Sequence, residues 1–268
     1  MSNAREYYDR TSREYLEKWR RPGEEENGTL YLRRRLIESL VDLADVREGE
    51  RLVEIGSGTG LVLRAALQRT RPVYGTDISV EMLKRARDDV LSEHDVSIVD
   101  RFEPTMPPAD VYLMVNDFRE LDLPRGFFDV ILSLEVLRYV DDVDRALRAV
   151  RTIAGPQTRF VFSVTNLFSS SLFPAKFSVR NLLGRVDPDR ELLQYFETES
   201  SIRRKVRDAG FRVTAFKRDG LPLLRKIALR PDSSGGEARK VERRERSLAE
   251  VPLLRGLYDT FLVAVRPR

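Results

Sequence analysis

Three glycines at alternate positions, Gly56, Gly58 and Gly60, follow a short apolar stretch at residues 52–55. An apolar stretch that stops at glycines is typical of a buried strand ending in a tight turn. A side chain would obstruct a ligand approaching this turn, so the glycines predict a binding loop. Residues 61–68 favour a helix, whose free N–H groups would point back at the ligand.

Two acids define the ligand further. Glu54 lies at the end of the predicted strand, where a carboxylate repels a pyrophosphate but can hold an ammonium group, directly or through water. Residues 73–77 predict a second strand ending in Asp77, and an acid about 20 residues after the loop suits both hydroxyls of a ribose. The spacing G-x-G-x-G also differs from the G-x-G-x-x-G of dinucleotide-binding proteins. The predicted ligand has a ribose and a cationic amine but no phosphate.

These segments resemble the class I S-adenosylmethionine-dependent methyltransferases. Residues 54–60 are similar to their first motif and residues 77–83 to their second, and the close likeness covers about residues 45–165. The resemblance implies an α/β, Rossmann-like, doubly wound fold with a mostly parallel seven-stranded sheet and an antiparallel last strand. It implies S-adenosyl-L-methionine as cofactor, without a metal. A dinucleotide-dependent oxidoreductase and a non-catalytic cofactor-binding relative stay open as alternatives.

Further strand ends bring polar residues to the same edge of the predicted sheet. A strand at 111–115 is followed by Asp117 and Phe118, and the resemblance implies that this acid accepts the adenine amino group while Phe118 borders the ring. Ligands of doubly wound sheets bind at the carboxyl ends of strands, so we expect one cleft. The predicted cofactor-binding residues are Tyr8, Tyr15, Glu54, Gly56, Ser57, Gly58, Gly60, Asp77, Ile78, Met82, Asn116, Asp117, Phe118, Ser133 and Leu134.

One of these interpretations has a plainer alternative. Met82 contacts the adenine or simply packs in the core. The segment around it is predicted as a helix over 80–91, followed by a proline-containing loop in which residues 96–99 could form a short strand.

The N-terminal residues 4–20 predict a polar helix outside the methyltransferase core. Tyr8, Tyr15 and Trp19 recur in steps of seven and four, so they share one face. This face docks the helix on the domain or, as the resemblance implies for a Tyr-Tyr-Asp segment, folds over the cofactor. We therefore predict residues 1–29 as a helical lid.

The remaining chain, residues 30–268, is predicted as the methyltransferase domain with insertions at about 165–195 and 219–258. The first insertion carries phenylalanines among small polar residues, and the second mixes apolar residues with cations at 221–229. Together they predict a hydrophobic acceptor pocket with a cationic rim. Such a pocket suits a small-molecule or lipid-linked acceptor with an acidic group, and weak peripheral contact with an anionic membrane surface. The alternative is an ordinary cap over a small soluble acceptor.

The segment 135–140 reads Glu-Val-Leu-Arg-Tyr-Val, where the resembling family often has a histidine. Arg138 cannot act as a base at ordinary pH. It is predicted to bind an acidic group of the acceptor, with a surface arginine as the alternative. Methyl transfer is an in-line displacement that depends mainly on alignment, and we name no catalytic residue. O- or N-methylation of a small or amphipathic molecule is expected.

The amino-acid composition narrows the classes of protein and of binding site that remain possible. The 268 residues include no cysteine and one histidine, which excludes disulfides and disfavours a metal site built from these residues. No apolar run approaches the ~20 residues of a membrane span, and the cytoplasm is the expected location. Residues 201–268 hold 18 Lys/Arg against 8 Asp/Glu, which marks an anionic partner or a solvated surface. RNA or protein methylation is a weaker alternative, because no nucleic-acid-binding module is recognisable.

Overall fold

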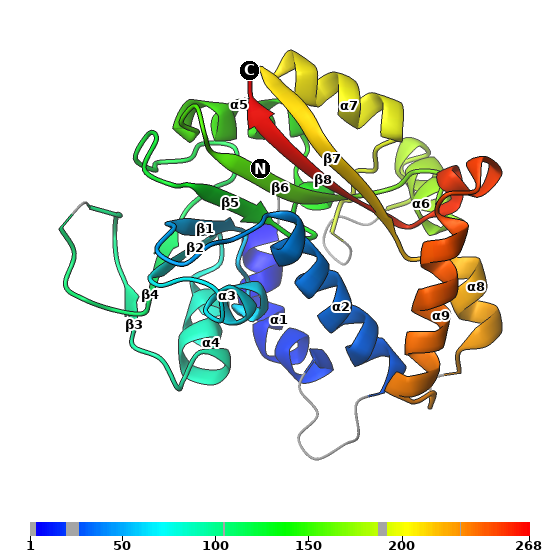
Figure 1. The fold of residues 1–268 in the computed structure, drawn as a ribbon, viewed down its shortest axis with the longest axis horizontal. Helices are drawn as coiled ribbons and strands as arrows, with labels where there is room; N and C mark the ends of the chain where they lie inside the picture. The colour runs from blue at the N-terminus through cyan, green and yellow to red at the C-terminus, as the bar shows by residue number, and fades with distance from the viewer. Residues whose placement is uncertain (1–3, 20–26, 104, 187–191, 231) are drawn as a thin grey trace.

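The computed structural model describes residues 4–19, 27–103, 105–186, 192–230 and 232–268. The described residues form one sheet with helices on both faces (Figure 1). The side chain of Trp19 lies outside this description, so its predicted place beside Tyr8 and Tyr15 stays a prediction.

The sheet is doubly wound and mostly parallel, as the sequence predicted. Its spatial order is β3-β4-β2-β1-β5-β6-β8-β7, and only β8 runs antiparallel to its neighbours. It has eight strands rather than seven because residues 96–98 pair with β4 as an additional edge strand. The strands are β1 (Leu52–Ile55), β2 (Val73–Asp77), β3 (Val96–Ile98), β4 (Val111–Val115), β5 (Val130–Ser133), β6 (Arg159–Thr165), β7 (Phe211–Asp219) and β8 (Thr260–Pro267).

Helices cover the two faces because successive strand side chains point to opposite sides. Val53 and Ile55 of β1 belong to the core under α5 and α7, whereas Leu52 belongs to the core under α2, α3 and α4. The helices are α1 (Ala4–Trp19), α2 (Gly28–Leu43), α3 (Leu61–Ala66), α4 (Val80–Arg85), α5 (Val143–Ile153), α6 (Phe173–Leu182), α7 (Glu199–Asp208), α8 (Pro222–Ala228) and α9 (Gly235–Leu248), with short helical turns η1 (Ala86–Val90), η2 (Leu137–Tyr139) and η3 (Pro252–Leu257). The helix predicted over 80–91 is therefore α4 continued by η1.

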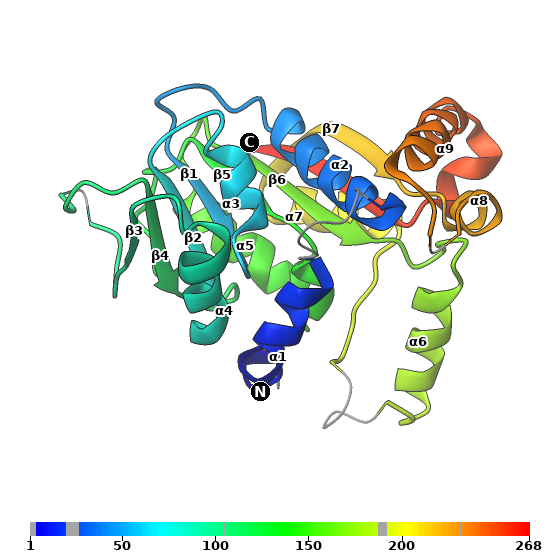
Figure 2. The ribbon, with the colours of Figure 1, turned by 90° about the horizontal axis from the view of Figure 1, so that it is seen from below.

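The two insertions project from the sheet in different ways. The first forms α6, which extends away from the sheet below α8 and α9 (Figure 2). The second forms α8 and α9, and α9 packs along α2. The inserted helices therefore lie at one end of the molecule.

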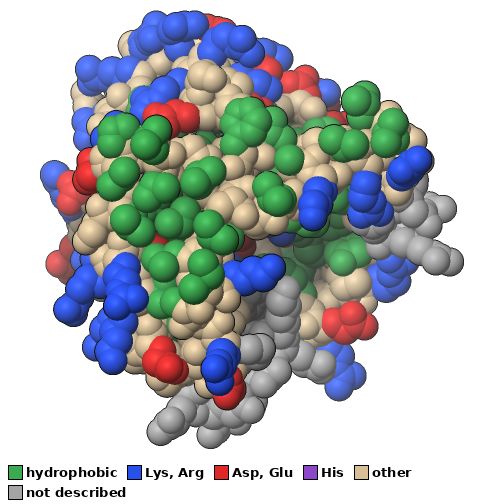
Figure 3. Space-filling model, turned by 90° about the vertical axis from the view of Figure 1, so that its right-hand side faces the viewer, with side chains coloured by type: hydrophobic (Ala, Val, Ile, Leu, Met, Phe, Trp, Pro, Cys, Tyr) green, Lys and Arg blue, Asp and Glu red, His purple; other side chains and the backbone are tan. Residues whose placement is uncertain are grey.

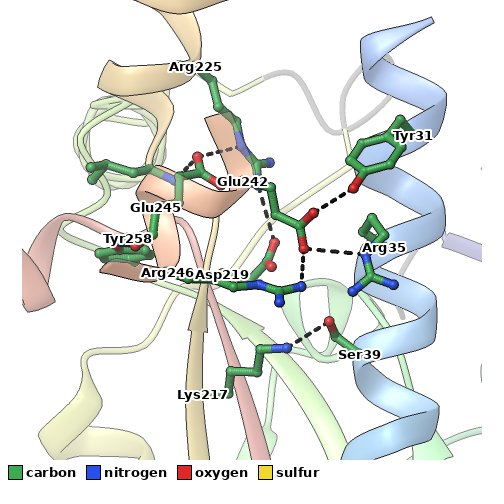
Figure 4. A network of polar contacts seen from close by, with 11 residues as sticks. Tyr31, Arg35, Ser39, Lys217, Asp219, Arg225, Glu242, Glu245, Arg246 and Tyr258 are labelled. Carbon is green, nitrogen blue, oxygen red and sulfur yellow. Dashed lines mark hydrogen bonds and ion pairs between the residues drawn. The ribbon is translucent and has the colours of Figure 1, made fainter. Parts of the chain in front are cut away.

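Buried carboxylates join α9 to its surroundings (Figure 4). Tyr31 of α2 donates a 2.7 Å hydrogen bond to Glu242, and Arg225 of α8 donates to both oxygens of Glu245 at 2.8 and 2.9 Å. Burial alone would raise the pKa of Glu242, but hydrogen bonds from Tyr31 and the nearby Arg246 outweigh it and hold that pKa below its ordinary value. A buried charge without partners would destabilise the fold, so this network explains how an arginine-rich helix packs against the domain.

Candidate active site

A cavity of about 640 Å³ lies at the carboxyl ends of β1, β2, β4 and β5. The chain passes from β1 to β2 on one side and returns to β5 on the other, so this is the point where the strand order reverses. Ligands of doubly wound sheets bind at this point. The volume falls within the range of about 300–1,000 Å³ that small-molecule sites occupy.

Most of the predicted site residues line this one cavity, although they come from five separate segments of the chain. The lining includes Tyr8, Tyr15, Gly56, Gly58, Asp77, Ile78, Met82, Asp117, Phe118, Leu134 and Arg138. The predictions for Glu54, Ser57, Gly60, Asn116 and Ser133 fall on residues that are not among those lining it.

Glu54 lies beneath the glycine loop. The residue is 2% exposed, the backbone N–H of Leu63 hydrogen-bonds its carboxyl, and its Oε2 has no hydrogen-bond partner among the described residues. Burial, followed by the nearby charge of Asp77, raises the pKa of Glu54 well above its ordinary value. Contact with an ammonium group, which the sequence suggested, would need a bridging water or a movement of this side chain.

The other four residues support the wall of the cavity through hydrogen bonds or backbone conformation. The Ser57 N–H donates to a β2 carbonyl at 2.8 Å, and the Asn116 N–H donates to the carbonyl of Asp77 at 3.0 Å. The Ser133 hydroxyl donates to a β1 carbonyl at 2.9 Å. Gly60 precedes α3 with φ of 82°, a conformation that favours glycine. These residues position the neighbours that do face the cavity.

The glycine loop has the geometry that close ligand approach requires. Gly56 has φ of +77°, and a Cβ added there would lie 2.3 Å from a methyl of Val136. Gly58 has φ of +51°, and a Cβ added there would have no neighbour within 4 Å, since this residue borders the open cavity. The first glycine is thus needed for packing, and the second leaves room for a ligand.

Asp77 is held in place by backbone donors. Gly58 N–H donates to its Oδ2 at 2.8 Å and Ser79 N–H to its Oδ1 at 2.9 Å. Burial raises the pKa of Asp77 to about 6. Each carboxylate oxygen can accept more than one hydrogen bond, so both remain able to accept from a ligand. A half-buried acid that borders the cavity fits the two hydroxyls of a ribose.

Asp117 lines the cavity beside a cation that the sequence analysis did not consider. Arg119 donates to its two oxygens at 3.1 and 2.7 Å, and these bonds hold the pKa of Asp117 below its ordinary value. The adenine amino group predicted for Asp117 would therefore share this carboxylate with Arg119. Asp117 lies two residues after the end of β4, and Arg119 lies two residues after Asp117. This close spacing in the chain was the signal that could have predicted the pair.

Helix α1 closes one side of the cavity. Tyr8 and Tyr15 line the wall, and Asp9 accepts a 2.6 Å hydrogen bond from the Ser79 hydroxyl at the start of α4. The Tyr8 ring also meets the Tyr139 ring edge to face, with centroids 5.8 Å apart. Burial raises the pKa of Tyr8, so its hydroxyl stays protonated near neutral pH. The sequence predicted this helix and its tyrosines but not the Asp9–Ser79 contact.

Another part of the cavity wall is formed by Arg138, Tyr139, Phe173, Phe177 and Gln194. Arg138 Nη2 donates to the Tyr139 hydroxyl at 2.5 Å. Arg138 Nε and Gln194 Oε1 are buried without a hydrogen-bond partner among the described residues. Polar groups of this kind are expected to meet a ligand, because leaving them unpaired costs free energy.

Of the two insertions predicted to build an acceptor pocket, only the first lines the cavity in the described chain. The first insertion supplies Phe173 and Phe177, but the residues that line the cavity in the described chain include none from the second insertion. That insertion is engaged with α2 through the carboxylate network instead. Tyr139 and Gln194 were missed: the first occupies the segment where the resembling family often has a histidine, and nothing in the sequence marks the second.

The fold, the glycine loop and the acid after β2 define a class I S-adenosylmethionine-dependent methyltransferase. The family described as "Methyltransferase domain" matches residues 29–215, and the chain belongs to that family. Its cofactor is S-adenosyl-L-methionine. This match sets aside the dinucleotide-dependent alternative. In the described part of the chain, every helix is too short or too polar to span a bilayer.

Two curated relatives and one solved structure illustrate the likeness. A ubiquinone biosynthesis O-methyltransferase of Alkalilimnicola ehrlichii is 28% identical over 70% of this chain and 71% of that protein. A ubiquinone/menaquinone biosynthesis C-methyltransferase of Pseudomonas aeruginosa is 30% identical, but the match covers only 58% of this chain and 59% of that protein. Magnesium protoporphyrin IX methyltransferase from Synechocystis PCC 6803, solved with bound S-adenosylhomocysteine, has a TM-score of 0.62 at 15% identity over 99% of this chain and 98% of that one. The last likeness shows the fold alone.

Proposed function

We propose that this enzyme methylates an oxygen or nitrogen of an amphipathic or lipid-linked acceptor that carries an anionic group. The observation behind the proposal is Arg138. It lies in the part of the cavity wall formed with Tyr139, Phe173, Phe177 and Gln194, which we call the acceptor end. Its Nε is unpaired, and it has no carboxylate partner among the described residues. Glu135 lines the same cavity, but it is ion-paired with Arg33 of α2. An acceptor anion would therefore meet an uncompensated guanidinium beside aromatic side chains.

In this proposal the cofactor residues bind and orient, and they take no part in proton transfer. Asp77 accepts from the ribose, Gly58 leaves space for close approach, and Phe118 and Met82 border the adenine. S-adenosylmethionine supplies a methyl group activated by the sulfonium charge. Tyr8 and Tyr15 exclude water from the reacting atoms, and alignment supplies much of the rate.

Arg138 also explains how an acceptor could react without a protein base. A nearby positive charge favours the ionised form of an acid, so Arg138 would lower the pKa of a phenol or carboxylic acid placed beside it. The acceptor would then arrive at the methyl group already deprotonated. This role fits a segment that has Arg138 and Tyr139 where the resembling family often has a histidine.

The relatives support the same acceptor class. Their names place them in ubiquinone biosynthesis, and ubiquinone is a quinone ring with a lipid tail. Phe173, Phe177 and Leu192 give the acceptor end an apolar wall suited to such a molecule. A lipid-linked acceptor resides in a bilayer, so the proposal includes weak peripheral contact with a membrane.

The test compares an alkyl-substituted hydroxybenzoate with its carboxamide as acceptors of labelled methyl. Wild-type enzyme should prefer the carboxylate by about 10- to 150-fold in kcat/KM, the equivalent of one charged hydrogen bond. Arg138→Gln should abolish that preference. Arg138→Lys should retain part of it, because lysine keeps the positive charge but lacks the planar guanidinium that can donate two parallel hydrogen bonds to a carboxylate. The affinity for S-adenosylhomocysteine, measured by calorimetry, should be equal in all three. Equal use of both acceptors by the wild-type enzyme would reject an anionic acceptor.

A further inference from the structure

Exposed hydrophobic side chains are concentrated in three segments, residues 165–186, 220–230 and 251–258. These segments contribute ten of the twelve large hydrophobic side chains that are exposed in the described chain. The most exposed are Leu253 at 89%, Leu182 at 86% and Ile227 at 76%. We call the exposed surface of these three segments the apolar face.

Hydrogen bonds hold the three segments side by side. Ser170 N–H donates to the carbonyl of Leu257 at 2.9 Å, and Leu223 N–H donates to the Ser170 hydroxyl at 3.2 Å. Asn166 Nδ2 donates to the carbonyl of Gly256 at 2.8 Å. Figure 3 shows hydrophobic side chains gathered on this side of the molecule, with Lys and Arg around and between them. The apolar face is therefore one surface and not three scattered patches.

The charge of the apolar face is one-sided. Its three segments contain seven Lys/Arg and no Asp/Glu, although the whole chain is nearly balanced at 47 against 43. Arg225 is directed inward to Glu245, while Lys176, Lys226 and Arg230 are exposed. A partner must therefore accept protruding apolar groups and positive charge together.

These two properties favour an anionic bilayer over a second copy of the chain. Two apolar faces in contact would place like charges opposite each other, which opposes association. A bilayer offers anionic headgroups to the cations and an apolar interior to the leucines and isoleucine. A contiguous group of exposed apolar side chains often marks a site of contact with a protein partner or a membrane.

The apolar face is continuous with the acceptor end of the cavity. Phe173 lines the cavity and is 46% exposed, and Phe177 lies one helical turn further along α6 on the cavity side. Val179 and Leu182 of the same helix are exposed instead. Helix α6 thus borders both the cavity and the apolar face.

We propose that the apolar face docks the enzyme on an anionic lipid bilayer, with Leu182, Ile227 and Leu253 inserted among the headgroups. The cavity then opens at the membrane surface, and the acceptor enters along α6. Docking itself needs no acceptor, whereas the entry route rests on the proposed function. Each cation near the surface contributes about fivefold to partitioning, so binding is weak and salt-sensitive.

The test measures co-sedimentation with vesicles of phosphatidylglycerol and phosphatidylcholine in equal parts, and with phosphatidylcholine alone. Wild-type protein should bind the anionic vesicles at low salt and be released at high salt. The triple variant Leu182→Ser/Ile227→Ser/Leu253→Ser should partition at least about 50-fold less, since three exposed apolar side chains lose their burial in the bilayer. Leu253→Ser alone should lose about tenfold. Its matched control is Ile98→Ser, which removes an exposed side chain of β3 far from the apolar face and should change nothing.

Calorimetry with S-adenosylhomocysteine shows that each variant is folded and separates the two proposals. Vesicle binding that persists while the acceptor test fails would support docking and reject the proposed acceptor. Wild-type protein that stays in the supernatant with anionic vesicles at low salt overturns docking. Equal losses of vesicle binding in Leu253→Ser and Ile98→Ser overturn the assignment to this face. A wild-type protein that forms a concentration-dependent dimer, which the triple variant does not form, also overturns it, because the face would then bind a second copy of the chain.

Discussion

The two ends of the cavity are built in different ways. The cofactor end depends on backbone: positive φ angles at Gly56 and Gly58, and backbone N–H groups that hold Asp77. The acceptor end depends on side chains from separate segments, such as Arg138 after β5 and Phe177 on α6. Backbone geometry tolerates few substitutions, whereas side chains can change one at a time. We therefore expect changes at the cofactor end to affect folding and binding, and changes at the acceptor end to affect selectivity.

The largest effect is expected for Gly56→Ala. Alanine at this positive φ is strained by about 1–2 kcal/mol, and overlap with Val136 adds about 1–3 kcal/mol. The free energy of unfolding should fall by about 2–5 kcal/mol, as measured by urea denaturation. Gly49→Ala is the matched control, because Gly49 has a similar φ of +78° with no atom within 4 Å of an added Cβ. It should lose only the strain. Equal losses would show that the Val136 contact relaxes freely.

Asp77→Ala tests the assignment of the ribose site. Loss of two charge-assisted hydrogen bonds should weaken S-adenosylhomocysteine binding by roughly 2–3 kcal/mol, since such bonds contribute about 1.5–3 kcal/mol each and are not additive. Calorimetry gives the affinity, and Asp122→Ala, at an exposed acid, is the control. Unchanged affinity in Asp77→Ala would reject this role for Asp77.

The pH dependence of cofactor binding tests the same residue without a substitution. The pKa of Asp77 is raised to about 6 in the folded protein, and ribose hydroxyls would donate to its ionised form. Affinity for S-adenosylhomocysteine should therefore be constant above about pH 7 and fall by up to tenfold per pH unit below about 6. The contribution of Asp77 to the stability of the unliganded protein should change in the opposite direction. A raised acid pKa means that the folded state binds the extra proton, so this contribution rises as pH falls from about 6 towards 4. An affinity independent of pH between 5 and 7 would contradict this.

Phe177→Leu tests the acceptor end. Phe177 is buried, and its ring contacts those of Phe173 and Phe196 with centroids 5.7 and 5.9 Å apart. A smaller side chain should lower kcat/KM for an alkyl-substituted acceptor by roughly three- to tenfold, the equivalent of about 1 kcal/mol. Affinity for S-adenosylhomocysteine should not change. Phe168→Leu is the control, because Phe168 is exposed and is not among the residues that line the cavity. A matching loss of cofactor affinity would show that the two ends are not separate.

The smallest effect concerns α1 as a lid. Its Tyr8 and Tyr15 border the cavity, so cofactor should stabilise the closed position of the helix. Amide hydrogen exchange over residues 4–19 should slow severalfold when S-adenosylhomocysteine binds. Exchange over α7, none of whose residues lines the cavity, provides the internal reference. Equal rates over α1 with and without ligand would reject the lid.

The limits of the sequence analysis follow the same division between the two ends. Strand, glycine loop and acid lie close together in the chain, so their geometry was predictable from local pattern. The orientation of Glu54 was harder, because strand side chains alternate and this one faces α3 beneath the loop. Arg119 and Gln194 were missed, since a side chain that meets a site through a turn or a long connection has no periodic signature.

The sequence by itself determined the class of enzyme, the cofactor and the edge of the sheet where chemistry occurs. It did so because short apolar runs, glycines and acids at defined spacings dictate a backbone path over few residues. Only the tertiary structure decided which insertion lines the cavity, and that α9 packs on α2 while α6 borders the cavity. Those choices depend on pairings such as Tyr31 with Glu242, more than 200 residues apart in the chain. Burial of a carboxylate requires partners that the fold alone can bring together.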